Sequence, residues 1–463
     1  MRRLQDIAVD CGGRLCGADR EFVAVNTDTR KLAAGELFVA LRGPNFDGNT
    51  YLAEAAARGA AGALAEREGP PGFPVILVAD ALSALQRAAQ AWRERLMLPL
   101  VAVAGSNGKT TSKEMISAIL AVRGSTLATA GNLNNHIGVP LTLLRLTPEH
   151  WHAVIEMGAN HAGNVTQLAA FAAPSIGIVT NAGAEHLEGF GSLEGAARAE
   201  GELFAALARD GTAVLNADDS FAPLWRDMTV ARIVTFGLGA KADFTARDIH
   251  TETTARGFLT RFTLMTPHGE AAIELQLAGK HNVLNALGAA AAASAAGATL
   301  TDIAIGLARM RPVTGRLQLR AVRAGAWLID DSYNANPSSL EAAIDVLESL
   351  GGRRLLVLGE MAELGTFARE AHQEAGRYAR DHGVARLFAL GEASRHAVET
   401  FGIGASWHAD VADLTAAVER ELASDTRVLI KGSRINRLER VVAALERSTA
   451  PTDLHEPAAE GVH

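Results

Sequence analysis

The sequence has little cysteine, no block of positive charge and no long apolar run, and each shortage excludes a class of protein. Two cysteines, Cys11 and Cys16, occur among 463 residues; they cannot form a zinc site alone, and such low usage suits a reducing cytoplasm. The net charge of -8 without a basic block argues against nucleic acid or an anionic membrane as the main partner. No apolar run could span a bilayer, and residues 1–6 carry no secretory signal. We therefore expect a cytoplasmic protein that does not insert into membranes.

What the sequence does have is enough length and apolar content for several domains. An apolar fraction of 48% is ample for packed cores, and 463 residues normally make about three domains. Short apolar runs alternate with helical segments, which predicts an α/β fold. The predicted domains are residues 1–98, 99–312 and 313–447, followed by a disordered polar tail at 448–463.

The stretch at residues 99–120 predicts a buried strand, a glycine-rich turn and a helix. Residues 100–104 form a short apolar run typical of a parallel strand, and residues 112–120 place apolar side chains at helical spacing. Free backbone N–H groups at such a helix start bind phosphate, a lysine adds positive charge, and a threonine hydroxyl can ligate magnesium. The residues concerned are Gly105, Ser106, Asn107, Gly108, Lys109, Thr110 and Thr111.

An ordinary glycine turn before a lysine-bearing helix is the alternative interpretation of this stretch. The strict phosphate-loop motif has a glycine five residues before Gly108, where this chain has Val103. The order of strand, glycines, Lys-Thr-Thr and helix nevertheless favours a phosphate loop.

Two later segments place carboxylates where a parallel sheet binds its ligands. Glu156 ends an apolar run and is predicted to bind magnesium on the phosphates. In a helix that Ser192 should cap, Glu200 shares the apolar face with Leu193, and a buried carboxylate needs a cation. A metal held between Glu156, His186 and Glu200 would provide one. The alternatives are a surface glutamate at the strand end and a salt bridge from Glu200 to an arginine.

Other polar segments are weaker signals. Two loops in the first domain, residues 26–30 and 43–49, could hold a diphosphate or a base, but solvated turns explain them better when taken alone. Asn282 begins an alanine-rich helix and could bond a base or phosphate, although a capped helix explains it equally well. Lys431 and Arg434, at a predicted helix start, suit a carboxylate.

Taken in order, these segments resemble the Mur ligases, the ATP-dependent amide-forming enzymes of peptidoglycan precursor synthesis. The family's G-x-x-G-K-T-T loop corresponds to residues 105–111, which accounts for the missing first glycine. Further matches are residues 28–31 with 35–41, 131–140, 156–161, 186–191, 333–337 and 431–434. The resemblance covers the whole chain except the tail.

The resemblance implies an α/β fold with three domains: a small mixed α/β UDP-binding domain, a central P-loop ATPase domain with a doubly wound sheet, and a C-terminal Rossmann-like domain. It also implies ATP and two magnesium ions as cofactors. The implied metal ligands are Thr110, Glu156, His186 and Glu200, and Lys109, Glu156, His186 and Glu200 are the implied catalytic residues. Nucleotide contacts are implied for residues 105–111 and for Asn282, Arg316 and Asp331. Substrate contacts are implied for Thr27, Asp28, Thr29, Arg30, Asp47, Asn49, Asn134, Asn135, His136, Tyr333, Asn334, Asn336, Lys431, Ser433 and Arg434.

Two positions depart from the family. Its members usually have a lysine where Glu200 stands, carbamylated to give a metal-binding carboxylate, and Glu200 would supply that carboxylate directly. Asn49 replaces the usual histidine of the F-D-G-H loop, which weakens the expected contact with UDP.

The implied reaction joins D-alanyl-D-alanine to UDP-MurNAc-tripeptide. The tripeptide carboxylate attacks the γ-phosphate of ATP to give an acyl phosphate and ADP, and the dipeptide amine then displaces phosphate. These two substrates are the implied partners, and we expect a monomer. Three alternatives remain: a sibling ligase that adds one amino acid, a folylpolyglutamate synthetase, which lacks the nucleotide-sugar domain, and a P-loop NTPase switch or binding module, which would not explain two further α/β domains.

Overall fold

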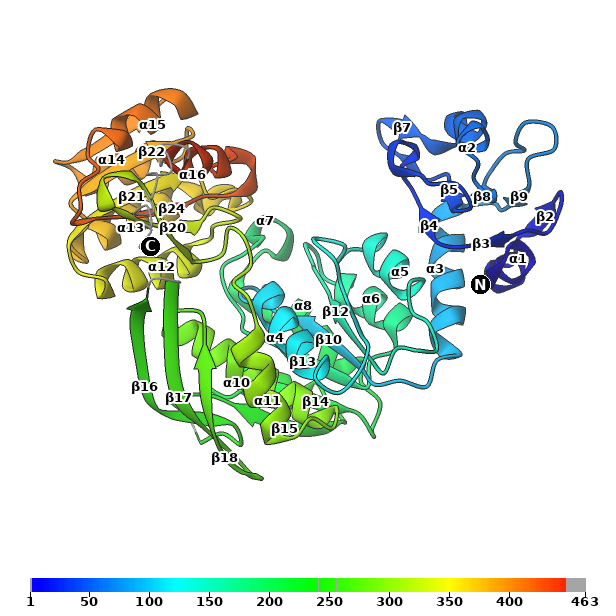
Figure 1. The fold of residues 1–463 in the computed structure, drawn as a ribbon, viewed down its shortest axis with the longest axis horizontal. Coiled ribbons are helices and arrows are strands. Elements are labelled where there is room, and N and C mark those ends of the chain that lie inside the picture. The colour runs from blue at the N-terminus through cyan, green and yellow to red at the C-terminus, as the bar shows by residue number, and fades with distance from the viewer. Residues whose placement is uncertain (1, 240, 255–256, 447–463) are drawn as a thin grey trace, which may run out of the picture. The chain divides into compact units, whose positions relative to one another are not determined.

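The computed structural model describes residues 2–239, 241–254 and 257–446. Contacts between Cα atoms divide the chain into two compact units (Figure 1). The first comprises Met1–Thr251, Thr260–Gln276 and Lys280–Arg311, and the second Glu252–Leu259, Leu277–Gly279 and Pro312–His463. The predicted tail at 448–463 lies outside the described residues. No helix of the described chain is both long and apolar enough to cross a bilayer.

The first unit opens with a small five-stranded sheet in the order β2-β9-β8-β5-β4. Only β2 pairs antiparallel to its neighbour; the other pairings are parallel. Its strands are β2 (Arg14–Cys16), β4 (Val25–Asn26), β5 (Leu37–Val39), β8 (Gly62–Ala65) and β9 (Val75–Leu77). Its helices are α1 (Leu4–Cys11), α2 (Leu52–Ala57) and α3 (Ala81–Glu94), and two short pairs, β1 (Arg2–Arg3) with β3 (Glu21–Phe22) and β6 (Arg42–Gly43) with β7 (Phe46–Asp47), lie beside it.

The apolar run within residues 21–25 is divided between two sheets. The residues at its start form β3, which pairs with β1, whereas those at its end form β4, which pairs with β5. Val23, between the two strands, is 65% exposed. A short apolar run therefore does not show whether one sheet or two will include its residues, because that depends on pairing partners far away in the chain.

The second sheet of this unit is parallel throughout and has the order β11-β12-β10-β13-β14-β15. Its strands are β10 (Leu100–Ala104), β11 (Thr126–Ala128), β12 (His152–Glu156), β13 (Ile176–Val179), β14 (Thr212–Asn216) and β15 (Arg232–Phe236). Its helices are α4 (Lys109–Leu120), α5 (Gly138–Leu143), α6 (Asn164–Ala172), α7 (Leu187–Phe190), α8 (Leu193–Ala205), α9 (Ala222–Asp227), α10 (Lys280–Ala295) and α11 (Leu300–Arg309). Chain order reverses on either side of β10, and such a switch point is where open α/β sheets bind ligands.

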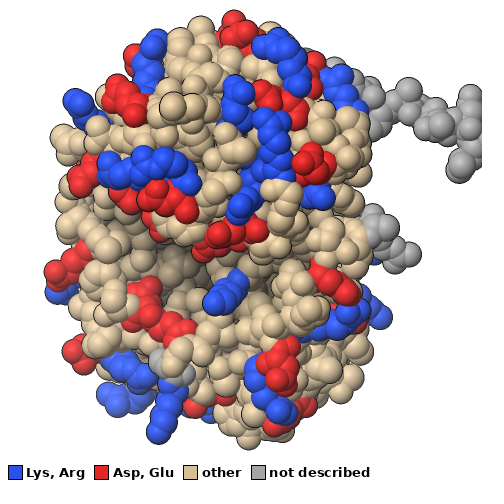
Figure 2. All heavy atoms as spheres, turned by 90° about the vertical axis from the view of Figure 1, so that its left-hand side faces the viewer, with Lys and Arg blue, Asp and Glu red and all other residues tan. Residues whose placement is uncertain are grey.

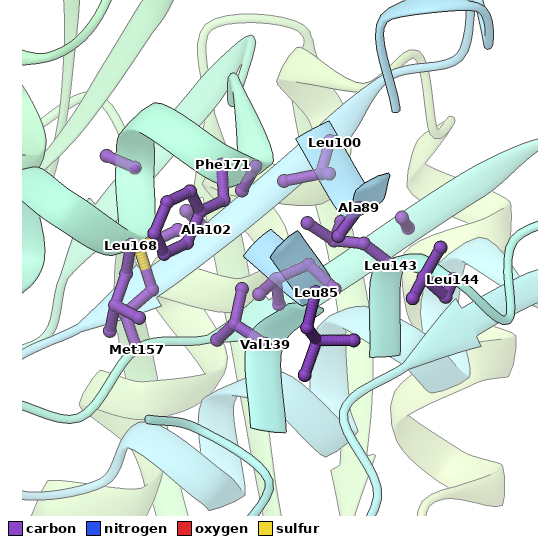
Figure 3. Close-up of a cluster of buried hydrophobic side chains, with 14 of the residues drawn as sticks. Leu85, Ala89, Leu100, Ala102, Val139, Leu143, Leu144, Met157, Leu168 and Phe171 are labelled. Carbon is purple, nitrogen blue, oxygen red and sulfur yellow. The ribbon is translucent and has the colours of Figure 1, made fainter. Parts of the chain in front are cut away.

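The helix α3, predicted as the end of the first domain, packs on the second sheet of the unit. Its Leu85 and Ala89 lie against Val139 and Leu143 of α5, in a core that also includes Leu100 of β10 (Figure 3). Two hydrogen bonds tie α3 to the same part of the chain: the indole N–H of Trp92 donates to the carbonyl of Leu146 at 2.9 Å, and the guanidinium of Arg93 donates to that of Ala172, also at 2.9 Å.

A three-stranded sheet that the sequence did not predict follows β15. Its strands are β16 (Thr245–Thr254), β17 (Gly257–Thr266) and β18 (Gly269–Leu275), and β17 and β18 pair antiparallel. Most side chains of β16 are exposed, so this strand lacks the apolar alternation that identifies a half-buried strand.

The second unit has a six-stranded sheet in the order β19-β20-β24-β21-β22-β23, in which only β19 pairs antiparallel. Alternate residues of its strands enter two separate cores, as a sheet covered on both faces requires. The strands are β19 (Gln318–Ala321), β20 (Trp327–Asp331), β21 (Arg353–Gly359), β22 (Arg386–Leu390), β23 (Ala405–His408) and β24 (Thr426–Lys431). The helices are α12 (Pro337–Ser349), α13 (Ala368–Asp381), α14 (Arg395–Phe401), α15 (Val411–Glu419) and α16 (Glu439–Glu446).

Acidic and basic side chains are interspersed on the face that Figure 2 presents. In the described chain as a whole, many basic groups are paired with carboxylates, for example Arg377 with Glu374 at 2.6 Å and Arg261 with Glu274 at 2.8 Å. This mixing accompanies the acidic net charge and the absence of a basic block in the sequence.

Candidate active site

The glycine-rich loop joins β10 to α4 at the switch point of the parallel sheet. Gly105 has φ +119° and Gly108 has φ +80°, conformations that a side chain rarely adopts. A Cβ on Gly105 would lie 2.2 Å from Thr180 Oγ1, just after β13. The helix α4 begins at Lys109, where backbone N–H groups at a helix start favour an anion. The N–H groups earlier in the loop are used within the protein: that of Gly105 donates to Glu200, and that of Ser106 donates to the carbonyl of Asn181. The predicted strand, loop and helix are all present.

The loop is held by polar side chains that follow β13. The backbone N–H of Asn107 donates to Asn181 Oδ1 at 3.0 Å, and the Thr180 hydroxyl donates to the carbonyl of Asn107 at 2.6 Å. On the α10 side, Gly108 approaches Asn285 so closely that an added Cβ would lie 2.4 Å from its Oδ1. Asn282, one turn before Asn285 and buried, accepts a hydrogen bond from its amide at 3.3 Å. The helix start that carries Asn282 therefore lies beside the loop.

Lys109 lies among three carboxylates. Its ammonium donates to the carbonyl of Ser106 at 2.9 Å and lies 3.3 Å from Glu185 Oε2. Burial alone lowers the pKa of Lys109, but the charges of Glu185, Glu200 and Glu156 together outweigh this and raise it. Lys109 therefore stays charged at neutral pH, as a phosphate-binding lysine must.

Glu200 is buried on the inner face of α8, as its place on the apolar stripe predicts. It is 2% exposed, and its Oε2 accepts the backbone N–H of Gly105 at 2.7 Å. Burial raises its pKa to about 7, and the charge of Lys109 opposes that shift. Ser192 caps the helix as expected, whereas Leu193, predicted on the same apolar face, is 41% exposed because it lies in the first turn, beyond the packed part of the helix.

Glu156 ends β12 with one carboxylate oxygen bonded and the other not. Asn134 donates to Oε1 at 2.8 Å, and the hydroxyl of Thr129 accepts the backbone N–H of Glu156 at 3.0 Å. Within the described chain, the buried Oε2 has no hydrogen-bond partner. A buried carboxylate oxygen in this state is a suitable ligand for a hard cation such as Mg²⁺.

The predicted ligands do not surround a single point in this conformation. Among the described residues, the ligand atoms of Glu156, His186 and Glu200 do not all lie within 4.8 Å of one another. The acidic groups instead face Lys109, and His186 Nε2 lies 3.6 Å from Glu185 Oε1. In this structure, the three predicted side chains are therefore not arranged to bind one ion together.

The residues predicted to contact the UDP-sugar form two tight turns. In the first, which includes Thr27 and the buried Thr29, Arg30 pairs with Asp28 through two nitrogens at 2.8 and 2.9 Å while its side chain stays 85% exposed. In the second, Asn49 is buried, donates to Asp47 Oδ1 at 2.7 Å and accepts the backbone N–H of Glu66 at 2.9 Å. The side-chain polar atoms of Asn49 are therefore bonded to Asp47 and to the residue that follows β8.

In the loop at residues 134–136, several polar atoms are also used in hydrogen bonds within the protein. Asn135 Oδ1 accepts the backbone N–H of Gly138 at 2.9 Å, which fixes the start of α5. The carbonyl of His136 accepts a hydrogen bond from Gln86 of α3 at 3.0 Å. Asn134 is the member of this group that contacts a predicted catalytic side chain, Glu156.

In the second unit, Lys431 forms a buried ion pair with Asp331 at 2.5 Å and also donates to the carbonyl of Asn334 at 3.0 Å. The prediction that Lys431 stands at a helix start is wrong, because it is the last residue of β24. Its charge is already balanced by Asp331, which β20 places beside it. Lys431 is therefore not an open anion site in this structure.

Two arginines, the half-buried Arg316 and the exposed Arg434, lie near the ring of Tyr333. The guanidinium of Arg316 is 4.4 Å from the ring centroid of Tyr333, and that of Arg434 is 5.8 Å from the same centroid. Ser433 donates to the carbonyl of Ala335 at 3.3 Å, and Asn336 caps α12 by accepting the N–H of Ser339 at 2.9 Å. The predicted loops 333–336 and 431–434 are thus adjacent.

Sequence reasoning missed several side chains that build the first site: Thr129, Thr180, Asn181, Glu185 and Asn285. Thr129, Thr180 and Asn181 directly follow the ends of parallel strands, and Asn285 lies one turn after Asn282 in α10. Their positions were therefore a usable signal. Glu185 had the strongest one, since it stands directly before His186.

Comparison with known proteins places the chain in a class that this fold and loop define. The Mur ligase middle domain matches residues 103–293, and the Mur ligase, glutamate ligase domain matches residues 315–434. The chain belongs to the Mur ligase family, whose fold is α/β with three domains.

The relatives described next are all ligases of one kind within that family. The chain is 44% identical, over 94% of its length and 96% of the relative, to the UDP-N-acetylmuramoyl-tripeptide--D-alanyl-D-alanine ligase of Escherichia coli. A crystal structure of MurF from Acinetobacter baumannii superposes with a TM-score of 0.89 at 32% identity, covering 96% of this chain and 99% of that one. A MurF ligase from Thermotoga maritima, solved in complex with ADP, has a TM-score of 0.81 at 25% identity and covers 92% and 97%.

Proposed function

We propose that the chain joins D-alanyl-D-alanine to UDP-MurNAc-tripeptide, with cleavage of ATP to ADP and phosphate through an acyl phosphate. The observation that carries this proposal is the full-length match to D-alanyl-D-alanine ligases combined with a phosphate loop at the switch point of the central sheet. A carboxylate is a poor acylating agent, and transfer of the γ-phosphoryl group converts it into one. The dipeptide amine then attacks the acyl carbon, and the bond from this carbon to the phosphate oxygen breaks. One oxygen of the carboxylate thus leaves in the phosphate, and the amine loses a proton as the amide forms.

In the first unit, we assign ATP binding to residues 105–111 and to Asn282. The N–H groups at the start of α4 and Lys109 would bind the β- and γ-phosphates, because phosphoryl transfer depends on positioning and charge neutralisation more than on covalent help. The C-terminal loops around Tyr333 and Ser433, with Arg316 and Arg434, are the proposed contacts for the nucleotide and the incoming dipeptide. The turns at Asp28–Arg30 and Asp47–Asn49 are the proposed contacts for the UDP-sugar.

Mg²⁺ is the proposed metal, and the residues present fit it. The free, buried Oε2 of Glu156 and the nearby carboxylates provide the oxygen ligands that this ion prefers. Thr110, Glu156, His186 and Glu200 are the proposed ligand set, shared between two ions rather than gathered around one. When bound, Mg²⁺ would neutralise charge on the transferring phosphoryl group. Glu156 is held for this task by Asn134 and Thr129.

The test is phosphate release from Mg·ATP with UDP-MurNAc-tripeptide and one amine acceptor at a time. Release with D-alanyl-D-alanine but not with single amino acids is the expected result. Release with a single amino acid would assign the chain to a sibling step. Release without acceptor and without sugar nucleotide would favour an NTPase and refute the proposal.

We further propose that the enzyme acts as a cytoplasmic monomer. Light scattering coupled to gel filtration should then give a mass near 48.5 kDa. A mass near twice that value would refute the monomer.

A further inference from the structure

Glu185 is a mostly buried carboxylate beside the phosphate loop, and the roles assigned above do not use it. It lies between β13 and α7, and its side chain is 13% exposed. Its Oε2 lies 3.3 Å from Lys109 Nζ, and its Oε1 lies 3.6 Å from His186 Nε2. One carboxylate thus contacts two side chains that are proposed to act on ATP.

The charges around Lys109 show what Glu185 does in the free protein. Three carboxylates, those of Glu185, Glu200 and Glu156, act on this one ammonium, and Glu185 has the largest effect of the three. Even when Glu200, whose pKa is raised to about 7 by burial, holds its proton, two carboxylates face one ammonium in a poorly solvated place. Charges interact much more strongly there than in water. A chain of phosphates brought to the loop would meet repulsion from this cluster.

We propose that Glu185 is a positioning residue that makes nucleotide binding conditional on a divalent cation. The inference rests on the nucleotide site proposed above. The Lys109 ammonium has three hydrogens, which bond the carbonyls of Gly105 and Ser106 and the carboxylate of Glu185. A phosphate that engages Lys109 displaces one of these partners, and the longest contact is that with Glu185. Its displacement leaves Glu185 as an uncompensated anion near the phosphates. A divalent cation bound at the same place offsets that charge. Metal and nucleotide therefore bind cooperatively, and each raises the affinity for the other by the same factor.

The experiment measures binding rather than turnover. The dissociation constant of adenylyl imidodiphosphate, an ATP analogue that is not cleaved, is determined by calorimetry in excess MgCl₂ and again in EDTA. The quantity of interest is the ratio of the EDTA value to the magnesium value. In Glu185→Gln this ratio should fall at least about tenfold relative to the wild type, within the 5–150-fold range usual for coupled sites. Most of the fall should come from tighter binding in EDTA.

Two further variants show whether charge is the cause. Glu185→Asp keeps the carboxylate and should keep most of the wild-type ratio. Glu194→Gln is the matched control, since it also removes one carboxylate from an ion pair, but that pair with Arg198 lies on the exposed face of α8. Its ratio should equal that of the wild type. Thermal unfolding of each variant without ligand confirms that it is folded, and Glu185→Ala serves as a second charge-free variant.

An unchanged ratio in folded Glu185→Gln, with both dissociation constants shifted by the same factor, would refute the inference while leaving the nucleotide site intact. Absence of nucleotide binding by the wild type in both conditions would instead refute the nucleotide site, and the inference with it.

Discussion

Replacing Glu200 with glutamine should remove a specific pH dependence of stability from the first unit. Burial raises the pKa of Glu200 from 4.5 to about 7 in the folded protein. Between these two pH values the unfolded chain has lost this proton and the folded chain has kept it, so the folded state loses stability as the pH rises through the window. A pKa difference of about 2.5, at 1.36 kcal/mol for each pKa unit, corresponds to about 3 kcal/mol. Glutamine has the same shape and can still accept the N–H of Gly105, but it cannot ionise.

The assay is native-state hydrogen exchange followed by mass spectrometry, read on the peptide that contains α8, for the wild type and Glu200→Gln at pH 5 and pH 8. At pH 5 the two proteins should have similar opening free energies. At pH 8 the variant should be more stable by about 3 kcal/mol, because only the wild type must bury a charge. Taking the difference between the two proteins at each pH cancels the contributions of groups that do not interact with Glu200. A difference that is the same at both pH values would refute the assignment of a raised pKa to this carboxyl.

Three other changes have defined outcomes. Lys109→Met should lower kcat in the phosphate-release assay by about 10²–10³-fold, since it removes a charge aimed at the transferring phosphoryl group; unchanged kcat would contradict its role. Glu200→Ala should abolish turnover, while added bicarbonate should leave the wild type unaffected because its carboxylate needs no carbon dioxide; bicarbonate stimulation of the wild type would count against this. Gly105→Ala should destabilise the protein by about 1–3 kcal/mol in thermal or urea unfolding, since its φ of +119° and the closeness of Thr180 both exclude a methyl group.

A fifth prediction concerns the second unit. Burial lowers the pKa of His372, whose Nε2 accepts the backbone N–H of Met361 at 2.9 Å. The unfolded chain therefore takes up a proton below pH 6.5 more readily than the folded one, and stability should fall as the pH drops through that value. Hydrogen exchange of the wild type, read on α13 at pH 5 and pH 8, measures this loss of stability. Equal protection of α13 at the two pH values would contradict the prediction.

Local signals in the sequence account for the parts of the site that lie close together in the chain. A short apolar run, glycines and a helical repeat were enough to predict β10, the loop and α4, because each depends on residues a few positions apart. The same holds for Ser192 as a cap and for the burial of Glu200, since helical spacing alone puts that residue on the packed face. The resemblance to a family of ligases then came from the order of such segments, and the comparisons bear it out.

Contacts between residues far apart in the chain were decided by tertiary structure alone. Nothing near Lys109 in the sequence indicates that Glu185, 76 positions later, is its partner, and Asp331 and Lys431 are separated by 100 positions. Such pairs depend on which strands become neighbours and on their register, and neither is encoded by the spacing of residues within one strand. The packing of α3 on α5 and α6 and the sheet of β16, β17 and β18 have the same origin. The sequence by itself determined the class of chemistry, and the tertiary structure decided which charges meet at the phosphate loop.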